Sequence, residues 1–100
     1  MIRGTTPTHT FKMPFSPENI KDIIVTYAQH GKVIFEKRTD ECSFTDDSVI
    51  VRLTQEETFL FPSSDDVYIQ LRVLLHDGSA LASCKYSVPL FDVLNDEVMT

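Results

Sequence analysis

The sequence predicts an all-β domain, an antiparallel β-sandwich of about six to seven short strands with one or two single-turn helices. Several runs alternate apolar and polar residues with a period of two, which is typical of half-buried strands. No run of ten or more residues has a helical period. Turn signals, among them His30-Gly31 and Asp77-Gly78, separate the runs. Because each alternating strand needs a facing sheet to cover its apolar side, we expect two packed sheets.

Length and composition indicate one domain over residues 1–100. The chain is 42% hydrophobic and 24% charged, as in ordinary globular domains. Residues 1–7 contain Gly4 and Pro7 and few side chains that could pack, so we expect them to form an N-terminal arm or the start of an edge strand. No repeat, low-complexity tract or linker divides the chain.

The first strand is predicted from His9 to Phe15, and its apolar face consists of Phe11, Met13 and Phe15. Pro7 and Pro14 cannot donate to a ladder, which places this strand at a sheet edge. Residues 16–19 favour one helical turn, with serine as N-cap and proline at N1. Ile23 to Gln29 carries apolar residues on both faces, as expected for a central strand.

His30-Gly31 predicts a type I′ hairpin that leads into a strand over residues 32–38. In that strand we expect Val33 and Phe35 to share one face. Residues 39–47 form a polar connection in which Cys42 and Phe44 are expected to point inward.

The next strand, residues 48–54, alternates strictly, with an inward face of Val49, Val51 and Leu53. Thr54 and Glu57 have the spacing of a capping box. The helix that they begin is expected to end near Phe61, before Pro62, with Phe59 and Phe61 closing one end of the core.

Residues 66–76 give the best strand signal in the chain, with an inward face of Val67, Ile69, Leu71, Val73 and Leu75. Asp77-Gly78 predicts a hairpin turn, and residues 79–88 predict the return strand. The pattern of residues 90–100 is compatible with a short helix or with a last strand, and does not decide between them.

Composition argues against several classes of partner. The net charge of −6 repels phosphate backbones and anionic lipids, so we expect neither nucleic acid nor membrane as partner. No apolar run approaches the ~20 residues of a membrane-spanning helix, and no signal peptide is expected. We expect synthesis in a cytoplasm, with Cys42 and Cys84 as free, partly buried thiols.

No motif predicts catalysis, a cofactor or a metal site. His9, His30 and His76 lie in different predicted elements without metal-ligand spacing, and a Cys84–His76 nucleophile pair would lack an orienting third group. The acidic pairs at 46–47 and 65–66 lack the spacing of an EF-hand and are expected to be solvated turns. We therefore expect no enzyme activity, with no catalytic, cofactor-binding or metal-binding residue.

Binding surfaces remain as the source of function. Tyr68 and Tyr86 lie on the last two long predicted strands, and both are candidates for a carbohydrate-binding platform if they face outward. The alternative for each is a half-buried tyrosine beside a β-ladder. Exposed strand edges at either end of the chain are templates for strand addition or for exchange between subunits.

The motifs RGTTPTHTFKMPF, LTQEETFLF and VYIQLRVLLHDGSALAS resemble small prophage-encoded structural proteins of Gram-positive bacteria. They are also similar to the N-terminal domain of phage baseplate upper proteins. The matching positions are residues 3–6, 53–58 and 77–78, so the likeness spans almost the whole chain. After the helix, residues 62–65 depart from the turn that is usual in the baseplate family.

The resemblance implies an immunoglobulin-like sandwich and a non-enzymatic tail or baseplate protein that acts through protein–protein contacts. Its partners would be other phage structural proteins or further copies of itself, and it would be incorporated in a virion. The alternative is a small carbohydrate- or host-surface-binding module that uses Tyr68 and Tyr86.

Overall fold

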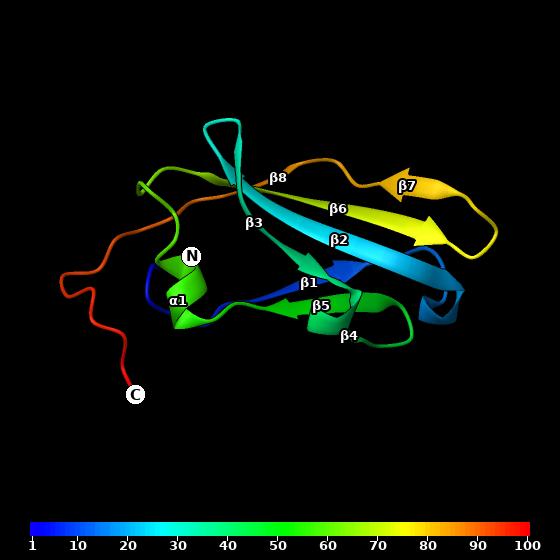
Figure 1. The fold of residues 1–100 in the computed structure, drawn as a ribbon, viewed down its shortest axis with the longest axis horizontal. Coiled ribbons are helices and arrows are strands. Elements are labelled where there is room, and N and C mark those ends of the chain that lie inside the picture. Colours follow the sequence, from blue (N-terminus) through cyan, green and yellow to red (C-terminus); the bar gives the residue numbers. More distant parts are fainter.

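The structure, a computed structural model, describes residues 1–100 and contains two antiparallel sheets (Figure 1). The smaller sheet has the order β1-β5-β4; in the larger, the order is β3-β2-β6, and both β7 and β8 pair along the far side of β6. The strands are β1 (Thr8–Lys12), β2 (Ile20–Gln29), β3 (Lys32–Arg38), β4 (Ser43–Phe44), β5 (Ser48–Arg52), β6 (Val67–Leu75), β7 (Ala80–Ala82) and β8 (Tyr86–Val88).

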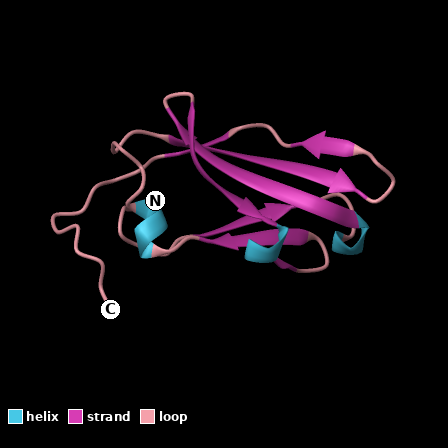
Figure 2. Cartoon of the chain, in the orientation of Figure 1, coloured by secondary structure: helices cyan, strands magenta, loops and turns pink.

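Helical structure is confined to single turns at the ends of strands (Figure 2). These are α1 (Gln55–Thr58) and the 3-10 turns η1 (Pro17–Asn19) and η2 (Thr39–Glu41). The predicted all-β sandwich is thus confirmed. The strand count exceeds the expectation because β4 has only two residues and because the last predicted strand is broken.

The strand order is that of an immunoglobulin-like sandwich. In such domains strands B, E and D belong to one sheet, and strands C′, C, F and G belong to the other. Here β1, β5 and β4 take the first three places, while β3, β2, β6 and the pair β7/β8 take the others. The parallel bridge between Ile2 and Phe91 links the start of the chain to the segment that follows β8.

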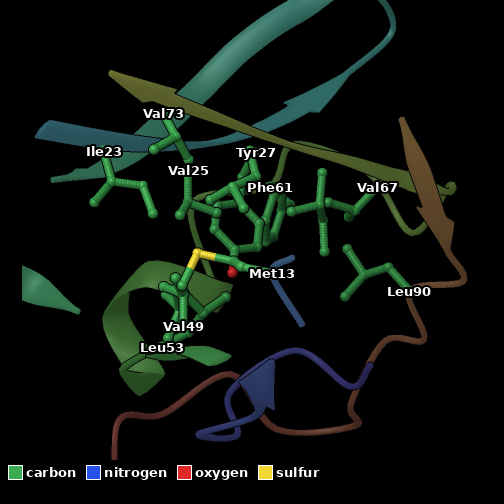
Figure 3. Close-up of a cluster of buried hydrophobic side chains, with 13 residues drawn as sticks. Met13, Ile23, Val25, Tyr27, Val49, Leu53, Phe61, Val67, Val73 and Leu90 are labelled. Atoms are coloured by element: carbon green, nitrogen blue, oxygen red, sulfur yellow. The ribbon is translucent and has the colours of Figure 1, made fainter. Parts of the chain in front are cut away.

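The core fills the space between the two sheets (Figure 3). Its central side chains come from alternate positions of β2, β5 and β6, and Phe61 closes one end as predicted. The members of this core are Met13, Ile23, Val25, Tyr27, Val49, Val51, Leu53, Phe61, Val67, Ile69, Leu71, Val73 and Leu90. The period-two pattern identified the inward positions of β5 and β6 correctly because each strand packs on a facing sheet, whereas the apolar residues on both faces of β2 left its inward face undecided.

The hairpin between β2 and β3 forms as predicted. His30 and Gly31 have φ angles of 52° and 74°, which a type I′ turn requires at both central positions. Opposite Tyr27 and Ala28 the register shifts, because Ile34 is an extra, unpaired residue in β3. Because Val33 pairs with Ala28 rather than continuing the parity of Phe35, the prediction that Val33 and Phe35 share a face was wrong.

The capping box before α1 is confirmed. Thr54 Oγ1 accepts the Glu57 N–H at 3.1 Å, and Glu57 Oε1 accepts the Thr54 N–H at 2.9 Å. The helix ends at Thr58, sooner than the predicted limit near Phe61. Phe59, the C-cap residue, is only half-buried.

Other predicted boundaries moved for local reasons. The first strand ends at Lys12, because beyond Met13 the chain turns at Pro14 toward η1. Cys42 packs against the core as expected, whereas Phe44 remains 37% exposed because β4 is the outermost strand of its sheet. The predicted strand over residues 79–88 is interrupted between β7 and β8, where Ser83 Oγ accepts the Leu71 N–H at 3.0 Å.

The two ends of the chain lie together, and residues 1–7 fold back onto the domain. Phe91 N–H donates to Met1 O and Arg3 N–H donates to Phe91 O, both at 2.9 Å. Gly4 N–H donates to Thr58 Oγ1 at 2.9 Å. Residues 92–100 form neither helix nor strand.

Candidate functional site

A serine, a histidine and an aspartate meet beside the β2–β3 hairpin, but their geometry does not support nucleophilic catalysis. His30 Nε2 lies 3.0 Å from Ser63 Oγ and 2.9 Å from Asp65 Oδ2. In a catalytic triad the serine and the carboxylate contact opposite ring nitrogens, so that the histidine can relay a proton. Here both contact the same nitrogen, and the His30 and Asp65 side chains are largely exposed. The contacts hold the loop at residues 62–66 against the hairpin.

The three histidines lie apart, and one faces the core. His9 Nδ1 lies 2.8 Å from the Tyr27 hydroxyl, a contact that the sequence did not indicate. Burial, followed by the positive N-terminus, lowers the pKa of His9, and burial raises the pKa of Tyr27. His76 follows β6 and donates its N–H to Asn19 O. No group of three or more metal-ligating side chains is arranged to hold an ion.

The cysteines and acidic turns also lie apart. Cys42 is partly buried beside the core and Cys84 is exposed in the break between β7 and β8. The backbone carbonyl of Asp47 accepts the Met13 N–H beside the smaller sheet, whereas the backbone carbonyl of Asp65 accepts from the Gln29 side-chain amide beside the β2–β3 hairpin. The two acidic turns therefore belong to different parts of the sandwich.

Tyr68 and Tyr86 project from opposite faces of the larger sheet. Cross-strand partners point to the same side, so Tyr86, opposite buried Ile69, faces the smaller sheet. Its ring lies 5.8 Å from that of Phe11. Tyr68 has the other parity in β6 and faces away from the smaller sheet. The two rings, each nearly half exposed, therefore do not form one carbohydrate platform.

A buried ion pair lies between β3 and α1. Lys37 Nζ lies 2.5 Å from Glu57 Oε2, and the Lys37 side chain is only 8% exposed. Burial alone would raise the pKa of Glu57. The hydrogen bonds from Lys37 and Thr54 and the charge of Lys37 lower this pKa by more than burial raises it, so the net shift is downward. Lys37 has the same parity in β3 as Phe35, which was the sequence signal for an inward side chain. Because lysine is rarely buried, this parity alone did not identify Lys37 as a buried residue. The pair fastens α1 to the larger sheet.

The strongest candidate for a functional surface is the side of the larger sheet that faces away from the smaller sheet. We call it the outer face. Arg72 lies near the centre of this face. Its large apolar side chains are Ile24, Val33, Tyr68 and Leu74. Ala28 lies between Val33 and Tyr68, and Ala80 and Ala82 lie beside Leu74 and Arg72 on the neighbouring strand β7. These small side chains leave shallow hollows in the surface.

The outer face carries two shallow hollows. One, of about 330 Å³, lies between the hairpin and β6 and is bordered by Ala28, Val33, Tyr68 and Lys85. The other, of about 200 Å³, lies further along the same strands and is bordered by Ile24, Arg72, Leu74 and Ala80. No helix covers this face (Figure 1). Its apolar side chains are therefore open to a partner.

Comparison with family models, with curated proteins and with solved structures finds no match to this chain. The fold and the outer face thus carry the functional argument. None of the helices is long and apolar enough to cross a bilayer.

Proposed function

We propose that this chain is a non-enzymatic structural or assembly protein of a phage or prophage, acting in a tail or baseplate through protein–protein contacts. It would be made in the cytoplasm of a bacterial host and incorporated in a virion. Its partners would be other phage structural proteins, further copies of itself, or both.

The exposed apolar outer face is the observation that carries this proposal. Val33 is 64% exposed and Tyr68 is 44% exposed, on a sheet face that also presents Ile24 and Leu74. The pair Thr26 and Gln70 separates the two apolar ends of this face, so apolar and polar groups alternate across it. Exposed apolar side chains gathered on one face are typical of protein–protein interfaces, and a tyrosine with a central arginine is typical of the residues that dominate binding energy. The resemblance of the sequence to prophage structural proteins gives the biological setting.

Particle composition tests the proposal. The Val33→Glu variant is placed in the prophage of the strain that encodes the chain, and particles are purified after induction. Because Val33 is exposed, glutamate should not disturb the fold, but it would place an unpaired charge in an apolar contact. We expect the amount of chain per particle to fall by about tenfold or more, measured by quantitative mass spectrometry.

Leu60→Glu is the matched control. Leu60 is similarly exposed, at 56%, but lies after α1 and outside the outer face. This variant should be incorporated as the unmodified chain is. Absence of the unmodified chain from purified particles would overturn the virion role. Equal incorporation of all three proteins would overturn the role of the outer face.

A further inference from the structure

One edge of the smaller sheet is open. Strand β1 pairs with β5 on one side and with no strand on the other. At the two ends of this pair, Leu53 N–H donates to Pro7 O at 3.0 Å and Met13 N–H donates to Asp47 O at 2.7 Å. In an antiparallel pair, residues alternate between bonding to the neighbour and pointing away from it. The backbone N–H and C=O groups on the free edge are therefore those of Thr8, Thr10 and Lys12.

An apolar groove runs beside this edge, between β1 and the last strands of the larger sheet. It has two hollows, of about 330 and 270 Å³. The first adjoins residues 8–11 and is lined by Phe11, Ile69, Tyr86 and Val88. The second adjoins residues 12–15 and is lined by Phe15, Leu71, Val73 and Leu81. Leu81 and Tyr86 are each 45% exposed there.

This groove is the place of a missing strand. In the immunoglobulin-like arrangement strand A lies beside strand B, the position of β1, but here that place is empty. The residues before β1 run elsewhere: Gly4, at φ 75°, turns the chain toward Thr58, and Arg3 bonds to Phe91. The N-terminal segment thus does not cover the groove.

The groove is bordered by one lysine and by no carboxylate. Lys12 adjoins the second hollow, whereas Lys85 borders the outer face, and the segments on either side, residues 8–15 and 80–88, contain no acidic residue. This is unusual in a chain with a net charge of −6. An extended segment that carries both apolar side chains and carboxylates would match the groove in backbone, in hydrophobicity and in charge.

Residues 93–100, with the sequence VLNDEVMT, have this composition and are themselves poorly paired. They carry two carboxylates and no cation, and make no hydrogen bond to another segment's backbone. Their hydrogen bonds to another segment are both with the Gln55 side chain, which donates to Met99 O and accepts the Met99 N–H. Leu94 is fully exposed and Met99 is 77% exposed.

We propose that residues 93–100 of one copy add as a strand to the free edge of β1 in a second copy. Leu94 and Val98 point to the same side of an extended chain and lie ~13 Å apart, at ~3.3 Å per residue. The two hollows adjoin residues 8–11 and residues 12–15. The centres of these two ranges are as far apart in sequence as Leu94 and Val98. Asp96 lies on the same side, between Leu94 and Val98, whereas Glu97 lies on the opposite side, where Lys12 is also exposed. Contacts of this head-to-tail type build rings or filaments.

This self-association adds to the proposed assembly role but does not use the outer face, so the two can fail separately. Its test uses sedimentation velocity at up to about 1 mM protein, where contacts with a dissociation constant of that order are half-formed. The average mass of the unmodified protein should rise with concentration above the 11.4 kDa of one chain. In parallel, the amides of Thr8, Thr10 and Lys12 should become slower to exchange with deuterium.

Two variants remove the two halves of the contact. Thr10→Pro deletes a backbone donor on the free edge, where proline is tolerated because it breaks no internal bond. Deletion of residues 93–100 removes the added strand. Each variant alone should stay at the mass of one chain, while an equimolar mixture should form a dimer, because each protein supplies the half that the other lacks. Thr10→Val keeps the donor and should associate normally.

Several outcomes would overturn the proposal. An unmodified protein that stays monomeric throughout the concentration range would do so. Association that survives deletion of residues 93–100 but is lost in Thr10→Pro would show direct pairing of two β1 edges instead. Val33→Glu, on the outer face, should leave association unchanged. Loss of association in this variant would assign self-association to the outer face.

Discussion

Replacing Glu57 by glutamine should destabilise the fold by about 3 kcal/mol, because the buried Lys37 ammonium loses its nearest counter-charge. The only other carboxylate near Lys37 Nζ, that of Glu41, is 3.9 Å away and is 44% exposed. Removal of one partner from a buried pair costs ~3–5 kcal/mol. The lower end applies here because Glu57 keeps 21% of its side-chain exposure and because Glu41 remains in reach.

Glutamine isolates the effect of charge. At residue 57, the third helical position, glutamine can still accept the Thr54 N–H, since a capping box uses either glutamate or glutamine. Urea unfolding, followed by far-UV circular dichroism, measures the loss. With a slope of about 1.5 kcal/mol per molar urea, a loss of about 3 kcal/mol lowers the midpoint by about 2 M.

Two further variants separate the ion pair from the cap. Thr54→Ala removes the cap but leaves the pair, and should cost ~0.5–2 kcal/mol. The double variant Lys37→Met/Glu57→Gln removes both charges and should regain much of the stability that Glu57→Gln loses, because an apolar side chain has no charge to desolvate. A cost for Glu57→Gln below about 1 kcal/mol, as for exposed pairs, would refute the reasoning.

The same pair gives stability a pH dependence with a defined sign. The folded-state pKa of Glu57 lies below its ordinary value of 4.5. A group with a depressed folded-state pKa stabilises the fold fully above its unfolded pKa, and this contribution is lost as the pH falls through the folded-state pKa. The difference in unfolding free energy between the unmodified protein and Glu57→Gln should therefore be largest near neutral pH and should shrink below pH 4.5.

Three other predictions use the same unfolding assay or nuclear magnetic resonance. Gly31→Ala should lower the unfolding free energy by ~1–2 kcal/mol, because the backbone there has a positive φ. Gly4→Ala should cost ~1–3 kcal/mol more, because its Cβ would also lie 2.6 Å from the Phe59 ring. Equal costs for the two variants would contradict this. Phe61→Ala should cost ~3–5 kcal/mol because the side chain is fully buried, and an unchanged melting temperature would show that it is not part of the core. The His9 ring should titrate below pH 6.5 because burial lowers its pKa, so His9 favours the fold above pH 6.5 and this contribution is lost as the pH falls; a midpoint of 6.5 would refute the burial. Tyr27→Phe removes the hydroxyl that His9 contacts and should shift the midpoint, and an unchanged midpoint would refute the contact.

The candidate surfaces were only partly accessible to sequence reasoning. Tyr68 was identified as an exposed candidate, and its parity in β6 does place it on the outer face. Val33 was assigned to the wrong face, because the bulge that shifts the β2–β3 register leaves no signature in the alternation. That shift adds a large apolar side chain to the outer face and makes it a stronger candidate for binding.

The amino-acid pattern by itself determined the features that depend on neighbours in the chain. Alternation identified the inward faces of β5 and β6; His30-Gly31 determined a hairpin; and Thr54 with Glu57 determined where α1 begins. Each of these follows from the backbone preferences or side-chain bonds of a few consecutive residues.

Tertiary structure decided which groups remain without a partner. The break between β7 and β8, the empty place beside β1 and the burial of Lys37 against Glu57 depend on segments far apart in the sequence. Strand pairing and sheet packing are long-range, so an isolated run of alternating residues does not show whether its edge will be covered or open. The surfaces available for assembly are therefore a property of the folded domain.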